Sequence, residues 1–106
     1  MSSNSGSASA GGEVDVRLDL SRHCVETAVR RAYNRAISDY FKPGGATAER
    51  EGRIDLLESA LSGLDLGGLR GRDPALAGGF DGEVVLGRDP AGRLTLSVDG
   101  RPVALD

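Results

Sequence analysis

The chain contains one histidine and one cysteine, and the two are adjacent as His23 and Cys24. Neighbouring residues on a helix point about 100° apart, so these side chains do not form a nucleophile–base pair by themselves. They also fall short of the set of about four ligands that a structural zinc ion needs. We therefore predict no catalytic residue, no metal site and no cofactor, and we expect Cys24 to lie at the rim of a helix.

Basic residues gather on one face of the segment that runs from Arg22 to Phe41. Arg31, Arg35 and Lys42 recur at helical spacings and form a basic ridge. A ridge of this size would neutralise about two or three phosphates, which gives weak and salt-sensitive binding to nucleic acid. The solvated outer face of a packing helix explains the same pattern, because charge on that face is what any amphipathic helix shows.

An acidic ridge follows on the next predicted helix, where Glu51, Asp55 and Glu58 share one face. Like charges at these spacings repel each other, and arginines facing the ridge would relieve the repulsion. We hypothesise that the acidic and basic ridges pair, within a helical hairpin or across a dimer, with chance arrangement as the alternative. Exposed ion pairs contribute only about 0–1 kcal/mol, so pairing would set orientation more than strength.

Glycine-rich spans raise the possibility of a phosphate-binding loop. None of them contains G-x-x-x-x-G-K-[ST], or G-x-G-x-x-G between a strand and a helix. The span from Gly67 to Arg72 places Arg70 and Arg72 beside flexible backbone, and Arg22 would extend the same surface. We keep these three arginines as an alternative anion-binding set, against an ordinary loop.

The spacing of apolar residues changes along the chain, and these changes predict the strands and helices that position the charged residues. Residues 13–20 alternate between apolar and charged side chains, which predicts a half-buried strand. From Arg22 to Phe41 apolar residues recur every three or four positions, which predicts a helix capped by Ser21. A second helix should begin near Thr47, with a frayed first turn because of Gly52. Its predicted apolar stripe is Ile54, Leu57 and Leu61.

The C-terminal part returns to a period of two after a leucine-rich loop at 64–80, which we expect to contain one helical turn after Asp73. Strands are predicted at 82–87, 93–98 and 101–105, with Asp99-Gly100 as a two-residue hairpin turn. Pro102 cannot donate to a ladder, so the last strand should be an edge. The fold class is therefore α+β: a helical hairpin packed on a small antiparallel sheet, in the order β-α-α-β-β-β.

Composition bounds the setting of this domain. The 106 residues carry a net charge of −3 and a pI near 5.1, which disfavours a dedicated nucleic-acid binder. Residues 1–12 are almost entirely small and polar, so we expect a disordered tail followed by one domain at 13–106. The lone cysteine, together with the lack of a signal or membrane-spanning pattern, predicts a cytoplasmic protein without membrane contact. Arginine in place of lysine is typical of GC-rich bacterial genomes.

These observations favour a non-catalytic protein-interaction or assembly module. We expect it to associate with itself, as a homodimer, through a helix face or a sheet edge, and the two charged ridges are the candidate partner-binding residues. The first alternative is a nucleic-acid-binding regulator that uses the basic ridge. The second is an accessory subunit of an enzyme, for which His23 and nearby acids are the only starting point.

Overall fold

The computed structural model describes residues 14–105, so the tail predicted at 1–12 lies outside the described residues. The described elements are β2 (Val16–Leu18), α1 (Val25–Tyr40), α2 (Ala48–Gly63), α3 (Leu66–Leu69), the 3-10 helix η1 (Pro74–Ala77), β3 (Val84–Arg88), β4 (Leu94–Val98) and β5 (Arg101–Pro102). This order confirms the predicted α+β class and the β-α-α-β-β-β sequence of the main elements.

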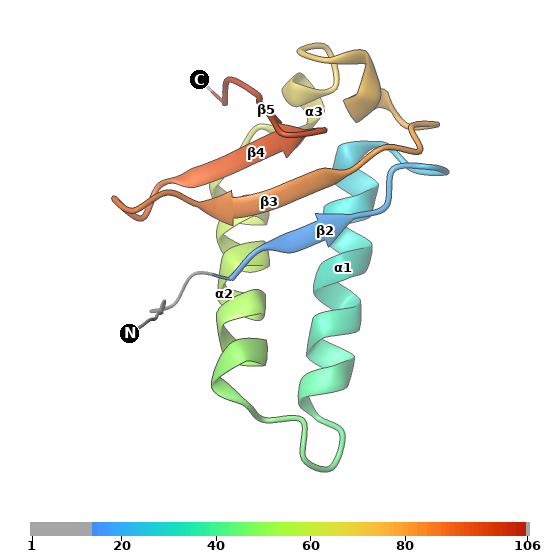
Figure 1. The fold of residues 1–106 in the computed structure, drawn as a ribbon. Helices are drawn as coiled ribbons and strands as arrows, with labels where there is room; N and C mark the ends of the chain where they lie inside the picture. The colour runs from blue at the N-terminus through green and yellow to red at the C-terminus, as the bar shows by residue number, and fades with distance from the viewer. Residues whose placement is uncertain (1–13, 106) are drawn as a thin grey trace.

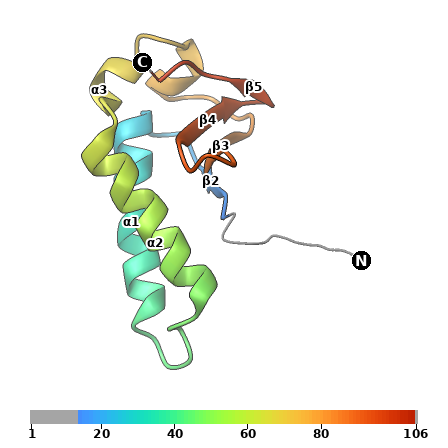
Figure 2. The same ribbon diagram turned by 90° about the vertical axis from the view of Figure 1, so that its left-hand side faces the viewer.

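The molecule has two layers. The four described strands form an antiparallel sheet in the order β2-β3-β4-β5. Helices α1 and α2 pack against each other as an antiparallel hairpin that covers one face of this sheet (Figures 1 and 2). Both helices run steeply across the strands and continue well past β2, so the loop end of the hairpin projects beyond the sheet.

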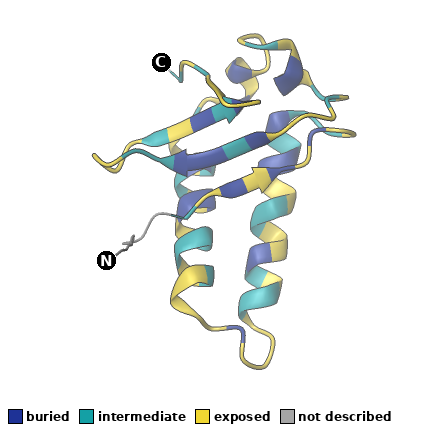
Figure 3. Ribbon diagram, viewed as in Figure 1, coloured by how far each residue is buried: buried dark blue, intermediate teal, exposed yellow. Residues whose placement is uncertain are grey.

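One hydrophobic core joins the sheet to the hairpin (Figure 3). The alternation predicted for the first strand is confirmed, although β2 itself is shorter than predicted. Its inward side chains, Val16, Leu18 and Leu20, are buried, and the intervening residues are exposed. The buried positions of β3 and β4 continue the same surface, because neighbouring strands place alternate residues on one face.

The start of α1 differs from the prediction. Ser21 does not cap the helix: its N–H and hydroxyl both donate to the Asp19 carboxylate, at 3.0 and 2.6 Å. These bonds turn the chain just after the strand, and α1 begins only after Cys24, which is the N-cap residue and makes no side-chain cap bond. The short polar turn competes with helix formation, as such side chains commonly do.

Helix α2 begins where the sequence predicts. The Thr47 hydroxyl accepts a hydrogen bond from the Arg50 N–H at 3.2 Å, which satisfies one free amide of the first turn. Fraying at Gly52 is not observed, since the helix is regular from Ala48. A Cβ on Gly52 would lie 3.0 Å from Cγ2 of Val14, so the glycine lets the chain entering β2 pass close to α2.

The buried face of α2 is rotated from the predicted stripe. Leu57 is buried as expected, but its buried neighbours are Leu56 and Ala60, whereas Ile54 and Leu61 are only partly buried. The reason is that α2 packs against both α1 and the sheet, so its apolar face is wider than a single stripe suggests.

The leucine-rich loop contains more structure than predicted. A short helix, α3, forms at Leu66–Leu69, and the Gly68 N–H donates to the Asp65 carboxylate at 3.0 Å. The expected helical turn after Asp73 is confirmed as η1, whose N–H at Ala75 bonds the Asp73 carboxylate at 3.0 Å. Leu66, Leu69 and Leu76 of this segment are buried in the core, and Leu64 is partly buried against it.

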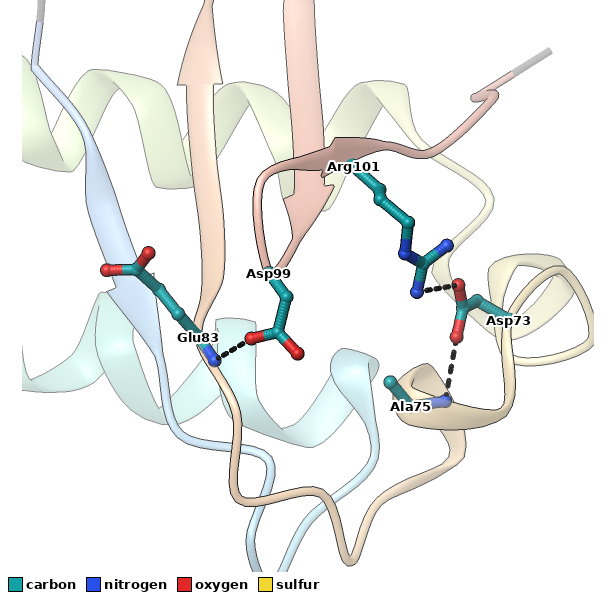
Figure 4. Close-up of polar contacts among 5 residues, drawn as sticks. All are labelled: Asp73, Ala75, Glu83, Asp99 and Arg101. Carbon is teal, nitrogen blue, oxygen red and sulfur yellow. Dashed lines mark hydrogen bonds and ion pairs between the residues drawn. The ribbon is translucent and has the colours of Figure 1, made fainter.

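The C-terminal edge is held by several polar contacts (Figure 4). Asp99 and Gly100 have φ values of 50° and 82°, the conformation of the predicted two-residue turn. The Asp99 carboxylate accepts the Glu83 N–H at 2.8 Å, and Arg101 reaches the Asp73 carboxylate at 3.3 Å. The predicted edge position of Pro102 is confirmed, since β5 is the last strand of the sheet.

The rotation of α2 makes a prediction about stability. Leu56 is 1% exposed, so Leu56→Ala should destabilise the protein by about 2–5 kcal/mol, the range for a buried leucine. Ile54→Ala, on the half-buried flank, should cost clearly less. Urea unfolding followed by circular dichroism measures both. Equal losses, or a larger loss at Ile54, would contradict the packing described for α2.

Candidate functional site

A groove of about 680 Å³ lies between strand β2 and helix α1. Its volume falls within the range of roughly 300–1,000 Å³ that is usual for ligand sites. The wall is β2, and the floor is α1 from Ala28 to Asp39. Figures 1 and 2 show that α1 continues past the sheet. One arginine of α2, Arg53, completes the lining. The groove exists because the hairpin is longer than the sheet is wide.

The wall presents free main-chain groups of β2. The Leu20 carbonyl accepts a hydrogen bond from the Phe80 N–H at 3.0 Å, so Leu20 faces the β3 side of the strand. Residues along a strand alternate in direction, which places Leu18 and Val16 on the same side, opposite Val84 and Leu86. The N–H and C=O groups of the intervening residues, Asp15, Arg17 and Asp19, therefore point away from the sheet.

Small side chains form the floor of the groove. Ala28, Ala32 and Ala36 follow one another at spacings of four and lie along one line of α1. Arg31 and Arg35 stand beside this line, also four residues apart, and Asp39 follows them on the next turn. The alanines leave space directly under the free edge of β2, and the arginines border that space with positive charge.

Most charged side chains of the groove already have partners. Arg17 pairs with Glu83 at 2.8 Å, and Arg53 approaches Glu49 at 3.8 Å. The Asp39 carboxylate accepts from Lys42 at 3.2 Å. Within residues 14–105, no ion pair or side-chain hydrogen bond is formed by Arg31 or Arg35. On the α1 side of the groove, the two side chains without a described counterion are therefore both positively charged.

Asp19 and Asp15 are the remaining carboxylates of the lining. The hydroxyl and backbone N–H of Ser21 bond to the Asp19 carboxylate and lower its pKa from the ordinary value. Asp15 lies on the outer face of the sheet, where its Oδ1 occupies the space that a side chain at Gly87 would need. Both aspartates are thus directed away from the two arginines of the floor.

The basic ridge predicted from the sequence is divided by the structure. Arg31 and Arg35 come together in the groove, as their spacing requires. Lys42 lies beyond the end of α1 and outside the groove lining, where it pairs with Asp39. Two of the three ridge residues therefore belong to the candidate site.

The acidic ridge does not face the basic one within the chain. Asp55 pairs with Arg88 of β3 at 3.1 Å, and Glu51 accepts a hydrogen bond from the Tyr40 hydroxyl at 3.2 Å. That bond raises the pKa of Tyr40. Glu58 is exposed on the outer side of α2. The pairing hypothesised within the hairpin is not observed, and its form across a dimer stays a prediction.

The alternative anion-binding arginines do not line the groove. Arg72 donates to the Ala104 carbonyl at 2.9 Å and so fastens the chain that follows β5. Arg70 lies near Cys24, since its positive charge contributes to a lowered pKa of that thiol. Arg22 is exposed in the turn before α1. These three arginines remain an alternative set with separate local roles.

The side chains of His23 and Cys24 lie in different surroundings. His23 lines the groove, whereas the Cys24 thiol lies 3.6 Å from the Thr27 hydroxyl. The nearby Thr27 backbone N–H, and then the Thr27 hydroxyl, favour the thiolate and lower the pKa of Cys24. Among the described residues there is no cluster of three or more metal-ligating side chains.

Sequence reasoning missed the part of the site that β2 and α2 supply. Asp15, Arg17 and Asp19 were recognised as the exposed side of a strand, and Arg53 was not singled out. The alternating pattern identifies which side chains point outward, but it does not identify which strand of the sheet is left unpaired. That depends on the strand order, which tertiary packing decides.

Within the described part of the chain, fold and groove together define a small two-layer α+β protein in which the unpaired edge of β2 lies beside a helical hairpin. Residues 14–92 match the model of a family of uncharacterised function, and the chain belongs to that family. The matched range contains every residue of the groove lining. No curated protein and no solved structure matches the chain. Within residues 14–105, no helix combines the length and the apolar character required to span a membrane.

The turn at Asp19 gives a prediction about ionisation. Ser21→Ala removes the hydroxyl that favours the charged carboxylate, so the pKa of Asp19 should rise toward its ordinary value. A depressed pKa stabilises the fold above the ordinary carboxyl range, and this contribution disappears as the pH falls through the folded-state pKa. The wild type and variant should therefore converge in stability in acid.

NMR titration of the side-chain carboxyl groups measures this effect. Asp89 serves as the control, because its pKa is lowered chiefly by the backbone N–H of Arg93, which the substitution leaves in place. If the pKa of Asp19 does not change, or if the pKa of Asp89 shifts by the same amount, Ser21 does not set the ionisation of Asp19.

Proposed function

We propose that this protein is a non-catalytic interaction module that binds a protein partner through β2 and the groove beside it. The proposal depends on one observation: main-chain groups and arginines without described partners lie together in the groove. The outward main-chain groups of β2 lack described partners, and Arg31 and Arg35 beside them lack described counterions.

An unpaired sheet edge supports this function for a physical reason. Its N–H and C=O groups are a template for another chain, and proteins usually cover or interrupt such edges unless they use them. Water can satisfy these groups, so the edge is stable when free and available for exchange. The two arginines add a charge preference, which favours a specific partner over non-specific edge pairing.

Self-association, as predicted from the sequence, remains one form of this proposal. A second copy is itself a protein partner, and the mass of the complex distinguishes it from another protein. The hypothesised pairing of Arg31 and Arg35 with acidic residues of a second copy belongs to this form.

Nucleic acid is the second candidate. Four arginines, Arg17, Arg31, Arg35 and Arg53, line the groove and would attract a phosphate backbone. Three aspartates line the same groove. A phosphate backbone, which is charged at every unit, cannot avoid their repulsion, whereas a peptide can place its carboxylates only beside the arginines. Since the net charge of the whole chain is −3, the overall field adds to that repulsion. The proposal therefore ranks a protein partner first.

Site-specific photo-crosslinking in the source cells tests this proposal. A photoreactive residue replaces Asn34, which is exposed and lines the groove. We expect a covalent adduct that is destroyed by protease and resists nuclease. The same residue at Thr95, exposed on β4 outside the groove lining, is the matched control and should give no such adduct.

Adding Arg35→Glu to the Asn34 crosslinking variant should reduce the adduct about tenfold, because a charge pair at the interface is lost. An adduct of twice the chain mass identifies a second copy. A nuclease-sensitive adduct would replace the proposal by the nucleic-acid alternative, and adducts of equal yield from both positions would mean that the groove is not the binding surface.

A further inference from the structure

We infer that the groove binds an extended, carboxylate-bearing segment of another protein, which joins the sheet as an additional strand beside β2. This inference rests on the proposed function and names the class of partner. It depends on the edge chemistry of the sheet, the charge of the groove, and the space that the hairpin leaves.

The two edges of the sheet differ in their ability to accept a strand. At the β5 edge, Pro102 lacks an N–H, and the Ala104 carbonyl already accepts a hydrogen bond from Arg72. Both features block an incoming ladder. At the β2 edge, the main-chain groups of Asp15, Arg17 and Asp19 point outward, and no hydrogen bond to them is made by residues 14–105. Of the two edges that the described strands form, β2 is therefore the one that can accept a partner strand.

The charge of the groove selects an acidic partner. A strand laid along β2 would point alternate side chains toward the floor, where Arg31 and Arg35 are exposed and carry no described counterion. The aspartates near them are already engaged: Asp39 with Lys42, and Asp19 with Ser21. Carboxylates on the inward face of the added strand would complete charge-assisted hydrogen bonds with these arginines.

The floor also limits the size of the side chains that fit. The line of Ala28, Ala32 and Ala36 lowers the surface of α1 beneath the free edge. Inward side chains between the carboxylates can occupy this space and contact the methyl groups. A strand that alternates acidic and apolar residues on its inward positions therefore matches both the charge and the shape.

A second copy of this chain does not fit as the added strand. Two β2 strands paired in one continuous sheet would be related by a two-fold axis perpendicular to it, so both hairpins would lie on the same face. Each hairpin continues past its own β2, under the position that the other sheet and its hairpin would take (Figures 1 and 2). The two hairpins would then occupy the same volume, whereas a single extended segment adds no helical layer.

The test uses the full chain and defined peptides. A short fluorescent peptide carries glutamate and valine in turn at every second position, with serine between them, so that its inward face alternates acidic and apolar residues. It is compared with a counterpart that carries lysine in place of glutamate. Fluorescence anisotropy should show that the glutamate peptide binds at least about tenfold more tightly, because only it can pair with Arg31 and Arg35. NMR spectra of the labelled protein should show the largest amide shifts at Asp15, Arg17 and Asp19.

Variants of the protein test the charge requirement. Arg31→Glu and Arg35→Glu should each weaken the glutamate peptide about tenfold and improve the lysine peptide. Arg30→Glu is the matched control on the same helix, since Arg30 pairs with Glu26 at 3.6 Å and does not line the groove. It should change either affinity by less than about twofold. The reversed preference is a readout that simple unfolding cannot produce.

Modified peptides test strand addition itself. Two versions of the glutamate peptide are N-methylated at alternate residues, in opposite phase. A peptide strand points successive N–H groups to opposite sides, so the version methylated toward β2 should lose binding and the other should keep it. Equal binding of the two versions would overturn strand addition, because side-chain charge alone would then explain the affinity.

The remaining outcomes separate this inference from the proposed function. Equal affinity for the glutamate and lysine peptides overturns the acidic partner. If neither peptide binds while the groove crosslinks to another protein, the partner is not an acidic strand, and the proposed function stands. If the crosslinked species is a second copy whose formation Arg35→Glu prevents, the inference is overturned in favour of self-association. If the groove crosslinks to nothing, both fail.

Discussion

The packing of the α1–α2 hairpin across one face of the sheet is the interaction on which the rest of this structure depends. It buries the inward side chains of β2, β3 and β4 against Val25, Val29 and Leu57, and so supplies most of the hydrophobic stabilisation. The helices cross the strands steeply, and the hairpin therefore extends past β2. The groove is a direct geometric consequence, since a helical floor continues where the sheet ends.

The two sheet edges show how local residues decide which surfaces remain available. Near β5, contacts from the segment between α2 and β3 tie the edge to the body: Arg101 to Asp73, and Arg72 to Ala104. Near β2, the polar turn at Asp19 and Ser21 bonds to itself, and no hydrogen bond from residues 14–105 reaches the outward main-chain groups of the strand. The leucine-rich segment thus does more than plug the core. By fastening the β5 edge, it leaves β2 as the edge whose outward main-chain groups lack partners among residues 14–105.

The sequence predicts the layers of this fold because both periodicities are local. Alternation in β2 and the three-to-four spacing in α1 depend on side chains a few residues apart, and Asp99-Gly100 specifies its turn by backbone conformation alone. The beginning of α1 and the face of α2 were mispredicted where another contact intervened. Asp19 captures Ser21, and α2 must cover two neighbours, so Leu56 is buried instead of Ile54. The site was only half predictable for the same reason: Arg31 and Arg35 share a face by spacing, but β2 meets them only after folding.

The arginines of α1 illustrate why a pattern of charge needs a fold before it has a meaning. On an isolated helix, the spacing of Arg31 and Arg35 is equally consistent with exposure to solvent, binding of phosphate or pairing with an acidic ridge. In the structure, Asp55 is engaged with Arg88 and Glu51 with Tyr40, so these two residues of the acidic ridge have other partners. The arginines instead border an edge that offers main-chain hydrogen bonds. An exposed ion pair alone contributes little, but one formed beside a ladder of backbone bonds selects the partner that those bonds hold. The backbone would supply the affinity and the arginines the choice, and neither alone distinguishes one extended segment from another.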